Sequence, residues 1–254
     1  MNLKSTARLL RELRLDSLAR ITNLRQPPVL ILGCGRSGTG TLHSMLGAHP
    51  QIQGLGEINV FNQPRRWSSR SLCHVNHIRK VTDHLLRSDI KATANRWLEK
   101  TPTNVWYLGD LLREFEDRIK VIHLVRDGRA VVTSYHPDCP DRYWVPPTRW
   151  IRDVECGLEF AAHESVMTLR YEDLVGNRPR YMKEVLDFLE LPMDEAVLRR
   201  NQDMPPRRIG HGAHEEIWKQ SQHRAVVEKL MAEPKAQALL DRLGYTGARQ
   251  AQRG

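Results

Sequence analysis

Two segments of the chain combine glycine, arginine and hydroxyl residues in patterns that hold anions. Residues 29–42 read VLILGCGRSGTGTL, and residues 120–134 read KVIHLVRDGRAVVTS. Each pattern predicts a buried strand, a tight turn and the start of a helix. The backbone N–H groups of such a turn point outward, and the helix dipole favours negative charge there. Two turns of this kind in one sheet indicate a ligand that carries phosphates at both of its ends.

The first turn differs from the loop that holds a nucleoside triphosphate. Gly33 and Gly38 have the G-x-x-x-x-G spacing, but Thr39 and Gly40 stand where a Lys and a Ser or Thr are required. The lysine that reaches the β- and γ-phosphates is therefore missing, and Arg36 supplies a cation from inside the loop instead. These residues predict an anion site without the geometry of an ATPase, and a glycine turn without a ligand stays open as the alternative. The hydroxyl groups available to anionic oxygens are those of Ser37, Thr39 and Thr41.

At these segments the chain resembles the sulfotransferases that use 3′-phosphoadenosine 5′-phosphosulfate, nearest to their bacterial and protein-tyrosine sulfotransferase-like branch. The resemblance runs from about residue 27 to about residue 192. In that family an Arg-Ser-Gly-Thr loop holds the 5′-phosphosulfate, and an Arg at a later strand end, with a Ser eight positions on, holds the 3′-phosphate. The matching residues are Gly35, Arg36, Ser37, Gly38, Thr39, Gly40 and Thr41 in the loop, and Arg126 and Ser134 after the later strand. Many family members carry a second Thr in place of Gly40, and Thr41 is expected to take over part of that donation.

Two later segments imply further contacts with the donor. The stretch LRYEDL, residues 169–174, resembles the family strand that ends at the adenine side. Tyr171 is therefore expected to flank the adenine, and simple packing of this ring stays open. Arg207 and Arg208 lie in a basic loop that is expected to close over the 3′-phosphate. Because the donor is polyanionic, it accounts for part of the net charge of +9.

Sulfuryl transfer moves an SO3 unit from a phosphate leaving group to a nucleophile, usually a hydroxyl. The enzyme must take the proton of the acceptor and must stabilise the charge that builds on the bridging oxygen of the leaving phosphate. It therefore needs a base on one side of the sulfuryl group and a cation on the other. The reaction requires no metal, and the sequence offers no obvious cluster of metal ligands.

The resemblance implies which residues supply the base and the cation. Glu57 lies in GLGEIN, residues 54–59, after a His-Pro turn, where the protein-tyrosine sulfotransferases and related bacterial enzymes carry their base. Lys100, in the stretch EKTP at a strand end, matches the family lysine that assists the leaving group. Arg36 is expected to share that work. A solvated loop carboxylate or a structural salt bridge stays open for Glu57.

Two histidines also bear on the choice of base. His136 lies in a proline-rich and aromatic stretch on the ligand side of the sheet, and it is the reserve base because cytosolic relatives use His. His123 lies inside an apolar strand, so it is expected to be a core residue rather than a base.

The apolar patterns predict an α/β domain with a P-loop, nucleotide-kinase-like parallel sheet flanked by helices, which is the sulfotransferase fold. The expected strands are residues 29–34, 96–100, 119–125 and 166–171, and the expected helices are residues 39–48, 75–88, 103–116, 128–135, 149–163 and 178–190. Strands that alternate with helices form parallel sheets with right-handed crossovers, and ligands bind at the carboxyl ends of the strands. The motifs described above all lie at those ends.

The chain of 254 residues is long enough for one large domain with a sizeable core. Residues 1–26 form a basic, amphipathic N-terminal arm, and residues 27–254 form a single sulfotransferase domain. Within that domain, residues 200–254 are expected to form a lid loop and C-terminal helices. The arm can lie on an anionic membrane, or it can pack on its own domain or on the second subunit of a homodimer, and packing is favoured.

Composition excludes several other classes of protein. The four cysteines form no C-x-x-C pair and are too few for a disulfide framework, which indicates a reducing compartment. Residues 1–26 lack the uninterrupted apolar stretch of a cleavable signal, and no stretch approaches transmembrane length. We therefore expect a cytoplasmic enzyme, with peripheral membrane contact through residues 1–26 left open. The sequence has no recognition signature for nucleic acid and no zinc-finger spacing.

These residues together predict a sulfotransferase that moves a sulfuryl group from 3′-phosphoadenosine 5′-phosphosulfate to a hydroxyl acceptor. A carbohydrate or lipid-linked sugar is the favoured acceptor, and a tyrosine in an acidic peptide is the alternative. A nucleotide-binding kinase or hydrolase is disfavoured by the missing Lys after Gly38. A protein that binds the nucleotide and transfers nothing is disfavoured because both Glu57 and Lys100 are present.

Overall fold

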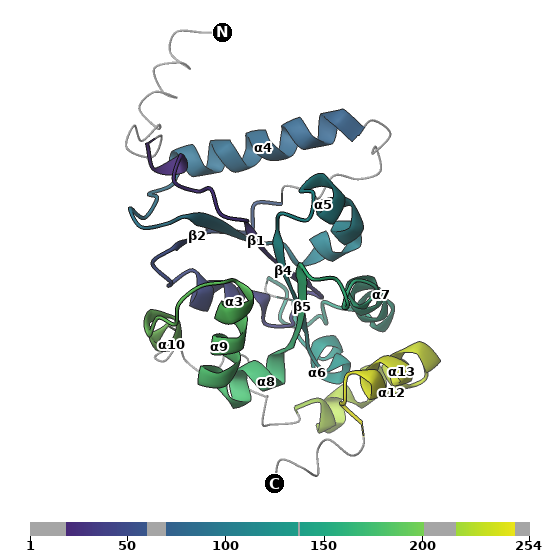
Figure 1. The fold of residues 1–254 in the computed structure, drawn as a ribbon. Coiled ribbons are helices and arrows are strands. Elements are labelled where there is room, and N and C mark those ends of the chain that lie inside the picture. Colours follow the sequence, from purple (N-terminus) through teal and green to yellow (C-terminus); the bar gives the residue numbers. More distant parts are fainter. Residues whose placement is uncertain (1–18, 60–69, 137, 201–216, 247–254) are drawn as a thin grey trace.

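A parallel five-stranded sheet forms the centre of the protein in this computed structural model (Figure 1). The structure describes residues 19–59, 70–136, 138–200 and 217–246. The strands are β1 (Val29–Gly33), β2 (Ile52–Gly56), β3 (Arg96–Lys100), β4 (Lys120–Val125) and β5 (Val166–Arg170). Their order across the sheet is β2-β3-β1-β4-β5, and every neighbouring pair is parallel. All five carboxyl ends therefore lie along one edge of the sheet, as the sequence predicted.

Helices cover both faces of this sheet. The first face carries α3 (Thr39–Leu46), α8 (Tyr171–Gly176), α9 (Arg178–Phe188) and α10 (Ala196–Arg199). The second carries α4 (Arg70–Arg87), the 3-10 helix η1 (Pro102–Tyr107), α5 (Leu108–Glu114), α6 (Gly128–Val132) and α7 (Pro147–Leu158). The side chains of β1 alternate between the two layers, since Val29 and Ile31 join one apolar cluster and Leu30 and Leu32 the other. Burial on both faces explains why β1 reads as a continuous apolar run.

The C-terminal part of the described chain packs on the second layer. It consists of η2 (Ile217–Lys219), η3 (Ser221–His223), α12 (Arg224–Met231) and α13 (Pro234–Arg242). Buried residues of α12 and α13 share one apolar cluster with α6 and α7. The lid loop expected within residues 200–254, together with Arg207 and Arg208, falls on residues 201–216, which lie outside the described residues.

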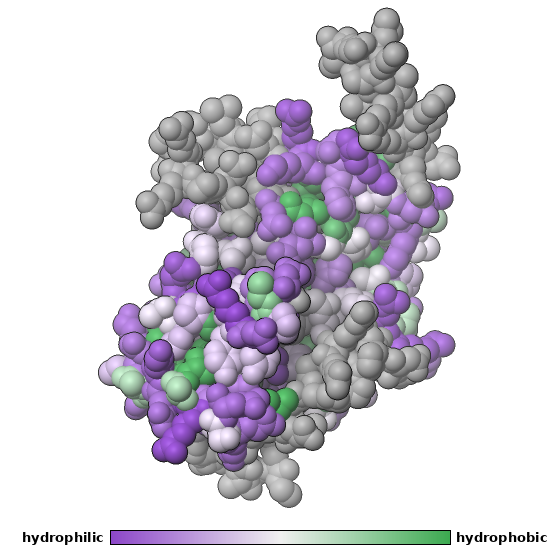
Figure 2. Space-filling view, turned by 180° about the vertical axis from the view of Figure 1, so that it is seen from behind, coloured by the Kyte–Doolittle hydropathy of each residue, from purple (hydrophilic) through white to green (hydrophobic). Residues whose placement is uncertain are grey.

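Most of the expected N-terminal arm also lies outside the described residues, which begin at residue 19. The end of the arm contacts the domain. Ile21 and Leu24 pack against the apolar cluster under α4, and Arg20 forms an ion pair with Asp89 at 3.5 Å. Within the described residues, no helix has the length and apolar character needed to cross a membrane. Seen from behind, the described surface is mostly hydrophilic, and hydrophobic residues show only in small separate patches (Figure 2).

The strand β2 is the main departure from the sequence prediction. Its sequence IQGLG contains two glycines and a glutamine, which are poor strand formers. It forms because it pairs with β3 at the edge of the sheet and because Ile52 and Leu55 are buried. The segment before Glu57, for which the sequence predicted no strand, therefore forms one, and Glu57 follows its carboxyl end.

Two other boundaries bear on the site. The helix expected over residues 128–135 ends at Val132, so Ser134 follows the helix rather than closing it. The strand expected to reach Tyr171 ends at Arg170, and Tyr171 is the first residue of α8.

The burial of His123 makes the stability of the protein depend on pH. As predicted, it is a core residue: it is 0% exposed, and neither ring nitrogen has a hydrogen-bond partner among the described residues. Burial lowers its pKa to about 4. Between the unfolded-state pKa of about 6.5 and this value, only the unfolded chain binds the proton, so stability falls as the pH falls, by about 1.4 kcal/mol per pH unit.

We expect His123→Leu to remove this component of the acid sensitivity. Urea unfolding at pH 7 and pH 4.5 measures it, and the variant should gain stability relative to the wild type at the lower pH. A difference between variant and wild type that is the same at both pH values would contradict this interpretation of His123.

Candidate functional site

The loop between β1 and α3 is shaped by two residues with positive φ. Arg36 has φ of 68° and Gly38 has φ of 90°. A Cβ atom on Gly38 would lie 2.3 Å from the ring of Tyr171, so only glycine allows this approach. The side chain of Ser37 is fully buried, and its Oγ has no hydrogen-bond partner among the described residues. Because buried hydroxyls are nearly always hydrogen-bonded, this unused donor inside the loop points to a ligand.

A second arginine lies against this loop. The Nη1 of Arg126, the residue after β4, donates a hydrogen bond to the carbonyl oxygen of Arg36 at 3.0 Å. Its guanidinium lies 4.8 Å from the ring centre of Tyr171, and its buried Nε has no partner among the described residues. Burial and the positive charge of Arg126 lower the pKa of Arg36. Two neighbouring cations that repel each other form a site that an anion would stabilise.

Tyr171 and Ser134 contact the protein in ways the sequence did not specify. Tyr171 is 1% exposed, because its ring fills the space between Gly38 and Arg126. The hydroxyl of Ser134 donates to the carbonyl oxygen of Ala130 at 2.9 Å, so it must rotate before it can donate to a ligand. The contacts of both residues with a donor therefore stay predictions.

The structure brings the predicted base and the predicted cation together. Glu57 follows β2 and Lys100 ends β3, and the pairing of these two strands places their carboxyl ends side by side. The Nζ of Lys100 donates to Oε2 of Glu57 in an ion pair. The Glu57 side chain is 44% exposed and that of Lys100 is 17% exposed, so a ligand at this edge can reach both.

A buried carboxyl group that sequence reasoning missed lies directly behind this pair. Glu99 is 0% exposed, accepts a hydrogen bond from the hydroxyl of Thr101 and accepts another from Nδ2 of Asn104 at 3.2 Å. Burial raises the pKa of Glu99 to about 7. Its hydrogen bonds, which include one with the backbone of Ile58, act in the opposite direction. Glu99 thus ties together the residues that follow Glu57 and Lys100. The only signal in the sequence that could have revealed Glu99 was a carboxylate at an interior position of a strand.

A partly buried carboxylate, Glu172, fixes the turn that carries Arg126. Glu172 accepts the backbone N–H of Asp127 at 3.0 Å and the hydroxyl of Tyr245 at 2.8 Å. Arg129 donates to Asp127 and to the carbonyl oxygen of Tyr245, so it is part of the structure of this turn. The C-terminal segment therefore helps to hold the second turn for which the sequence predicts anion binding.

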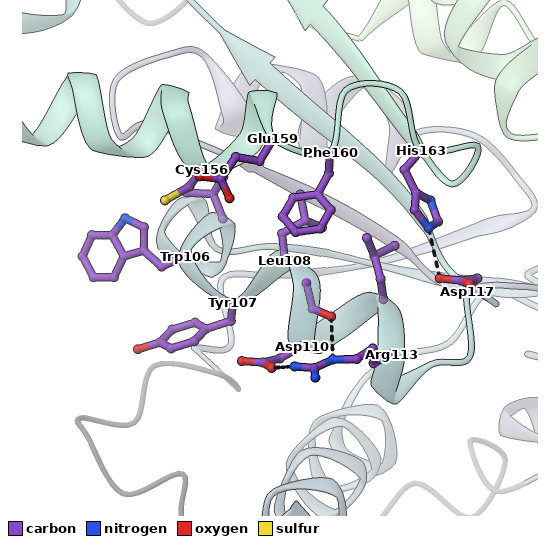
Figure 3. Close-up of a pocket in the computed structure, with 13 residues that line it drawn as sticks. Trp106, Tyr107, Leu108, Asp110, Arg113, Asp117, Cys156, Glu159, Phe160 and His163 are labelled. Atoms are coloured by element: carbon purple, nitrogen blue, oxygen red, sulfur yellow. Dashed lines mark hydrogen bonds and ion pairs between the residues drawn. The ribbon is translucent and has the colours of Figure 1, made fainter. Parts of the chain in front are cut away.

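The reserve base His136 does not lie with these groups in a hydrogen-bonded cluster. Its ring contacts the ring of Trp144, with centroids 4.6 Å apart. A cavity of about 540 Å³ is lined by residues of η1, α5 and α7 and of the segment after α7 (Figure 3). Its walls include Trp106, Phe160 and His163, and none of the predicted site residues. In the described part of the chain, no three His, Cys, Asp or Glu side chains are grouped so that they could hold a metal ion.

Comparison with known protein families identifies the kind of domain this is. The model of a sulfotransferase family, Sulfotransfer_3, matches residues 27–195. This range includes β1 to β5 and every predicted site residue except Arg207 and Arg208.

Curated relatives agree with that match. A protein-tyrosine sulfotransferase 1 of Danio rerio is 28% identical over 216 residues, which cover 72% of this chain and 58% of that protein. Protein-tyrosine sulfotransferase A of Caenorhabditis elegans is 26% identical over 208 residues, which cover 71% of this chain and 54% of that protein. The chain therefore spans little more than half the length of these two relatives.

Solved structures share the fold. The sulfotransferase domain of the Synechococcus PCC 7002 olefin synthase has a TM-score of 0.57 and 19% identity, with 88% of this chain and 97% of that one covered. The sulfotransferase domain from the curacin biosynthetic pathway has a TM-score of 0.56 and 19% identity, with 88% of this chain and 100% of that one covered. The predicted fold is thereby confirmed.

The unused donor in the loop gives a direct test of the anion site. We expect Ser37→Ala to leave the free energy of unfolding unchanged or slightly raised, because the buried hydroxyl makes no bond to the described protein. The same variant should bind inorganic pyrophosphate more weakly by about fivefold or more, the scale of one hydrogen bond to a charged group. Calorimetry measures the affinity and urea unfolding the stability.

A second serine far from the loop serves as the control. Ser88, at the end of α4, bonds to the carbonyl oxygen of His84, so Ser88→Ala should leave pyrophosphate binding unchanged. Equal affinity of the wild type and Ser37→Ala would show that the loop does not use this hydroxyl.

Proposed function

Because the chain belongs to the sulfotransferase family, we propose that it transfers a sulfuryl group from 3′-phosphoadenosine 5′-phosphosulfate to a hydroxyl acceptor. The observation that carries this proposal is the Glu57–Lys100 ion pair at the edge of the sheet that also carries the loop and Arg126. A base and a cation beside an anion site are the groups that the reaction needs.

The residues of the loop fit the donor. The buried Ser37 hydroxyl and the backbone of the loop are suited to the 5′-phosphosulfate, which brings the sulfuryl group. Arg126, on the next strand of the sheet, is suited to the 3′-phosphate, with Ser134 as a second contact after rotation of its hydroxyl. Arg36 contributes positive charge between these two ends.

The ion pair supplies the chemistry of transfer. In the pair Glu57 is a carboxylate, the form that accepts a proton. Glu57 takes the proton of the acceptor hydroxyl as the hydroxyl oxygen forms its bond to sulfur. The bond between sulfur and the bridging oxygen breaks, and its electron pair stays on that oxygen, where Lys100 and Arg36 stabilise the negative charge. The products are the sulfated acceptor and adenosine 3′,5′-bisphosphate.

A carbohydrate or lipid-linked sugar hydroxyl is the acceptor that we propose first. The named protein-tyrosine sulfotransferases among the relatives support a tyrosine in an acidic peptide as the second candidate. Transfer of ³⁵S from labelled donor to a panel of sugars, glycolipids and tyrosine peptides distinguishes the two. ATP turnover with magnesium and no sulfuryl transfer to any acceptor would favour a kinase-like enzyme instead.

Binding of the nucleotide tests the two anion sites. We expect the protein to bind adenosine 3′,5′-bisphosphate without added metal and to bind adenosine 5′-monophosphate at least about tenfold more weakly, because a charge-assisted contact with Arg126 is lost. Arg126→Gln should remove most of this preference. Calorimetry of both ligands on both proteins measures it.

Arg118→Gln is the matched control, since Arg118 is an exposed arginine that precedes β4 and pairs with Glu116. It changes the net charge equally and should keep the preference. Equal affinity of the wild type for the two nucleotides would refute the assignment of Arg126 and Ser134 to the 3′-phosphate.

Substitution of the ion pair tests the mechanism. Glu57→Gln keeps the shape of the side chain but cannot accept the proton, so turnover should fall by roughly 10²–10⁴-fold while nucleotide binding is kept. Lys100→Ala should also slow transfer, because charge on the leaving phosphate is less well stabilised. A more acidic acceptor, such as a phenol, needs less help from a base, so it should partly rescue Glu57→Gln and do little for Lys100→Ala.

Glu116→Gln is the matched control. Glu116 is an exposed carboxylate that pairs with Arg118 at the other end of the sheet, so this variant should keep the wild-type rate. If Glu57→Gln also turned over at the wild-type rate with a hydroxyl acceptor, the base would be a different residue and His136 would be the next one to test.

A further inference from the structure

A histidine on α3 makes a direct contact with the strand that precedes Glu57. Nε2 of His43 accepts the backbone N–H of Gly56 at 3.0 Å. Gly56 is the last residue of β2 and the immediate neighbour of Glu57. This bond joins the helix that follows the anion-binding loop to the strand that presents the proposed base.

The strand is shaped around this imidazole. A Cβ atom on Gly54 would lie 3.3 Å from both Cε1 and Nε2 of His43, so the ring fits closely because Gly54 has no side chain. The pairing of β2 with β3 shifts register between Gly54 and Gly56, opposite Leu98 and Glu99. Such a bulge redirects the residues that follow it. Here those residues begin with Glu57.

The charge state of His43 suits this contact. Its burial, together with the positive charge of Lys100, lowers its pKa to about 4. The ring therefore stays neutral over the pH range in which a carboxylate base works, and the bond from the Gly56 N–H requires the tautomer with its proton on Nδ1, which leaves Nε2 able to accept. The effect of Lys100 on the imidazole also places His43 near the Glu57–Lys100 ion pair.

We propose that His43 is a positioning residue for the base: by accepting the Gly56 N–H it holds the end of β2 so that the Glu57 carboxylate meets Lys100 and the reacting hydroxyl. This role rests on the proposed function, in which Glu57 is the base. His43 does not contact the acceptor through Nε2, because that nitrogen is used by Gly56. Its effect on the rate must therefore pass through Glu57.

A pair of variants separates the hydrogen bond from the bulk of the side chain. His43→Leu removes the acceptor, and His43→Gln keeps an amide oxygen near the position of Nε2. We expect His43→Leu to lower kcat at least about tenfold with an unchanged KM for the donor, because small misplacements of a catalytic group are costly. His43→Gln should retain most of the wild-type rate.

The matched control is His123→Leu, which replaces a buried neutral histidine that has no contact with the ion pair. It should leave kcat unchanged. Hydrogen exchange of the Gly56 amide provides a readout that does not depend on activity. It should be faster in His43→Leu than in the wild type, and close to the wild-type rate in His43→Gln.

A double variant shows whether His43 positions Glu57 or supports the fold in general. If His43 acts through Glu57, His43→Leu should have no further effect on the residual rate of Glu57→Gln. An equal fall in both backgrounds, or no fall in kcat in the wild-type background, would overturn the positioning role. If Glu57→Gln itself kept the wild-type rate, the proposed base would be wrong, whereas the Gly56 amide would still report whether the His43 contact exists.

Discussion

Parallel pairing of the strands sets the order of the functional side chains along one edge of the sheet. Because the order is β2-β3-β1-β4-β5, the strand ends present Glu57, Lys100, the loop with Arg36, Arg126 and Tyr171 in that sequence. Because β1 packs into both layers, a slip of one residue would exchange its side chains between two layers of different shape, and close packing disfavours that exchange. The base and the anion sites thus depend on strand pairing more than on any single loop.

Buried and partly buried polar groups behind this edge contact the segments that carry the exposed ones. Glu99 connects the segments that follow Glu57 and Lys100, and Glu172 holds the turn that begins after Arg126. His43, on α3, adds a third support through Gly56. Each of these groups costs free energy when it is buried, and each is satisfied by hydrogen bonds to the backbone or to neighbouring side chains. Such contacts fix the backbone on which the proposed base and cation stand, and accurate placement of reacting groups is what transfer requires.

Local patterns in the sequence were sufficient for four of the five strands and for the expectation that Glu57 and Lys100 lie at the carboxyl edge of the sheet, but they did not predict the ion pair between these two residues. They failed for β2, whose glycines argue against a strand until β3 is present to pair with it. They also failed for Tyr171, which starts a helix and fills the space under the loop instead of ending a strand. Contacts such as His43 with Gly56 depend on packing of a helix on a bulged strand, which residue spacing does not encode.

A crystal structure of the protein with adenosine 3′,5′-bisphosphate tests the central claim most directly. The account predicts the 5′-phosphate within about 3 Å of the Ser37 hydroxyl and of loop N–H groups, and the 3′-phosphate within the same distance of the Arg126 guanidinium. It also predicts that Lys100 and Glu57 lie beside the 5′-phosphate, on the side where a sulfuryl group would be attached. A nucleotide bound elsewhere, or bound in the loop with the Glu57–Lys100 pair remote from its 5′-phosphate, would contradict it.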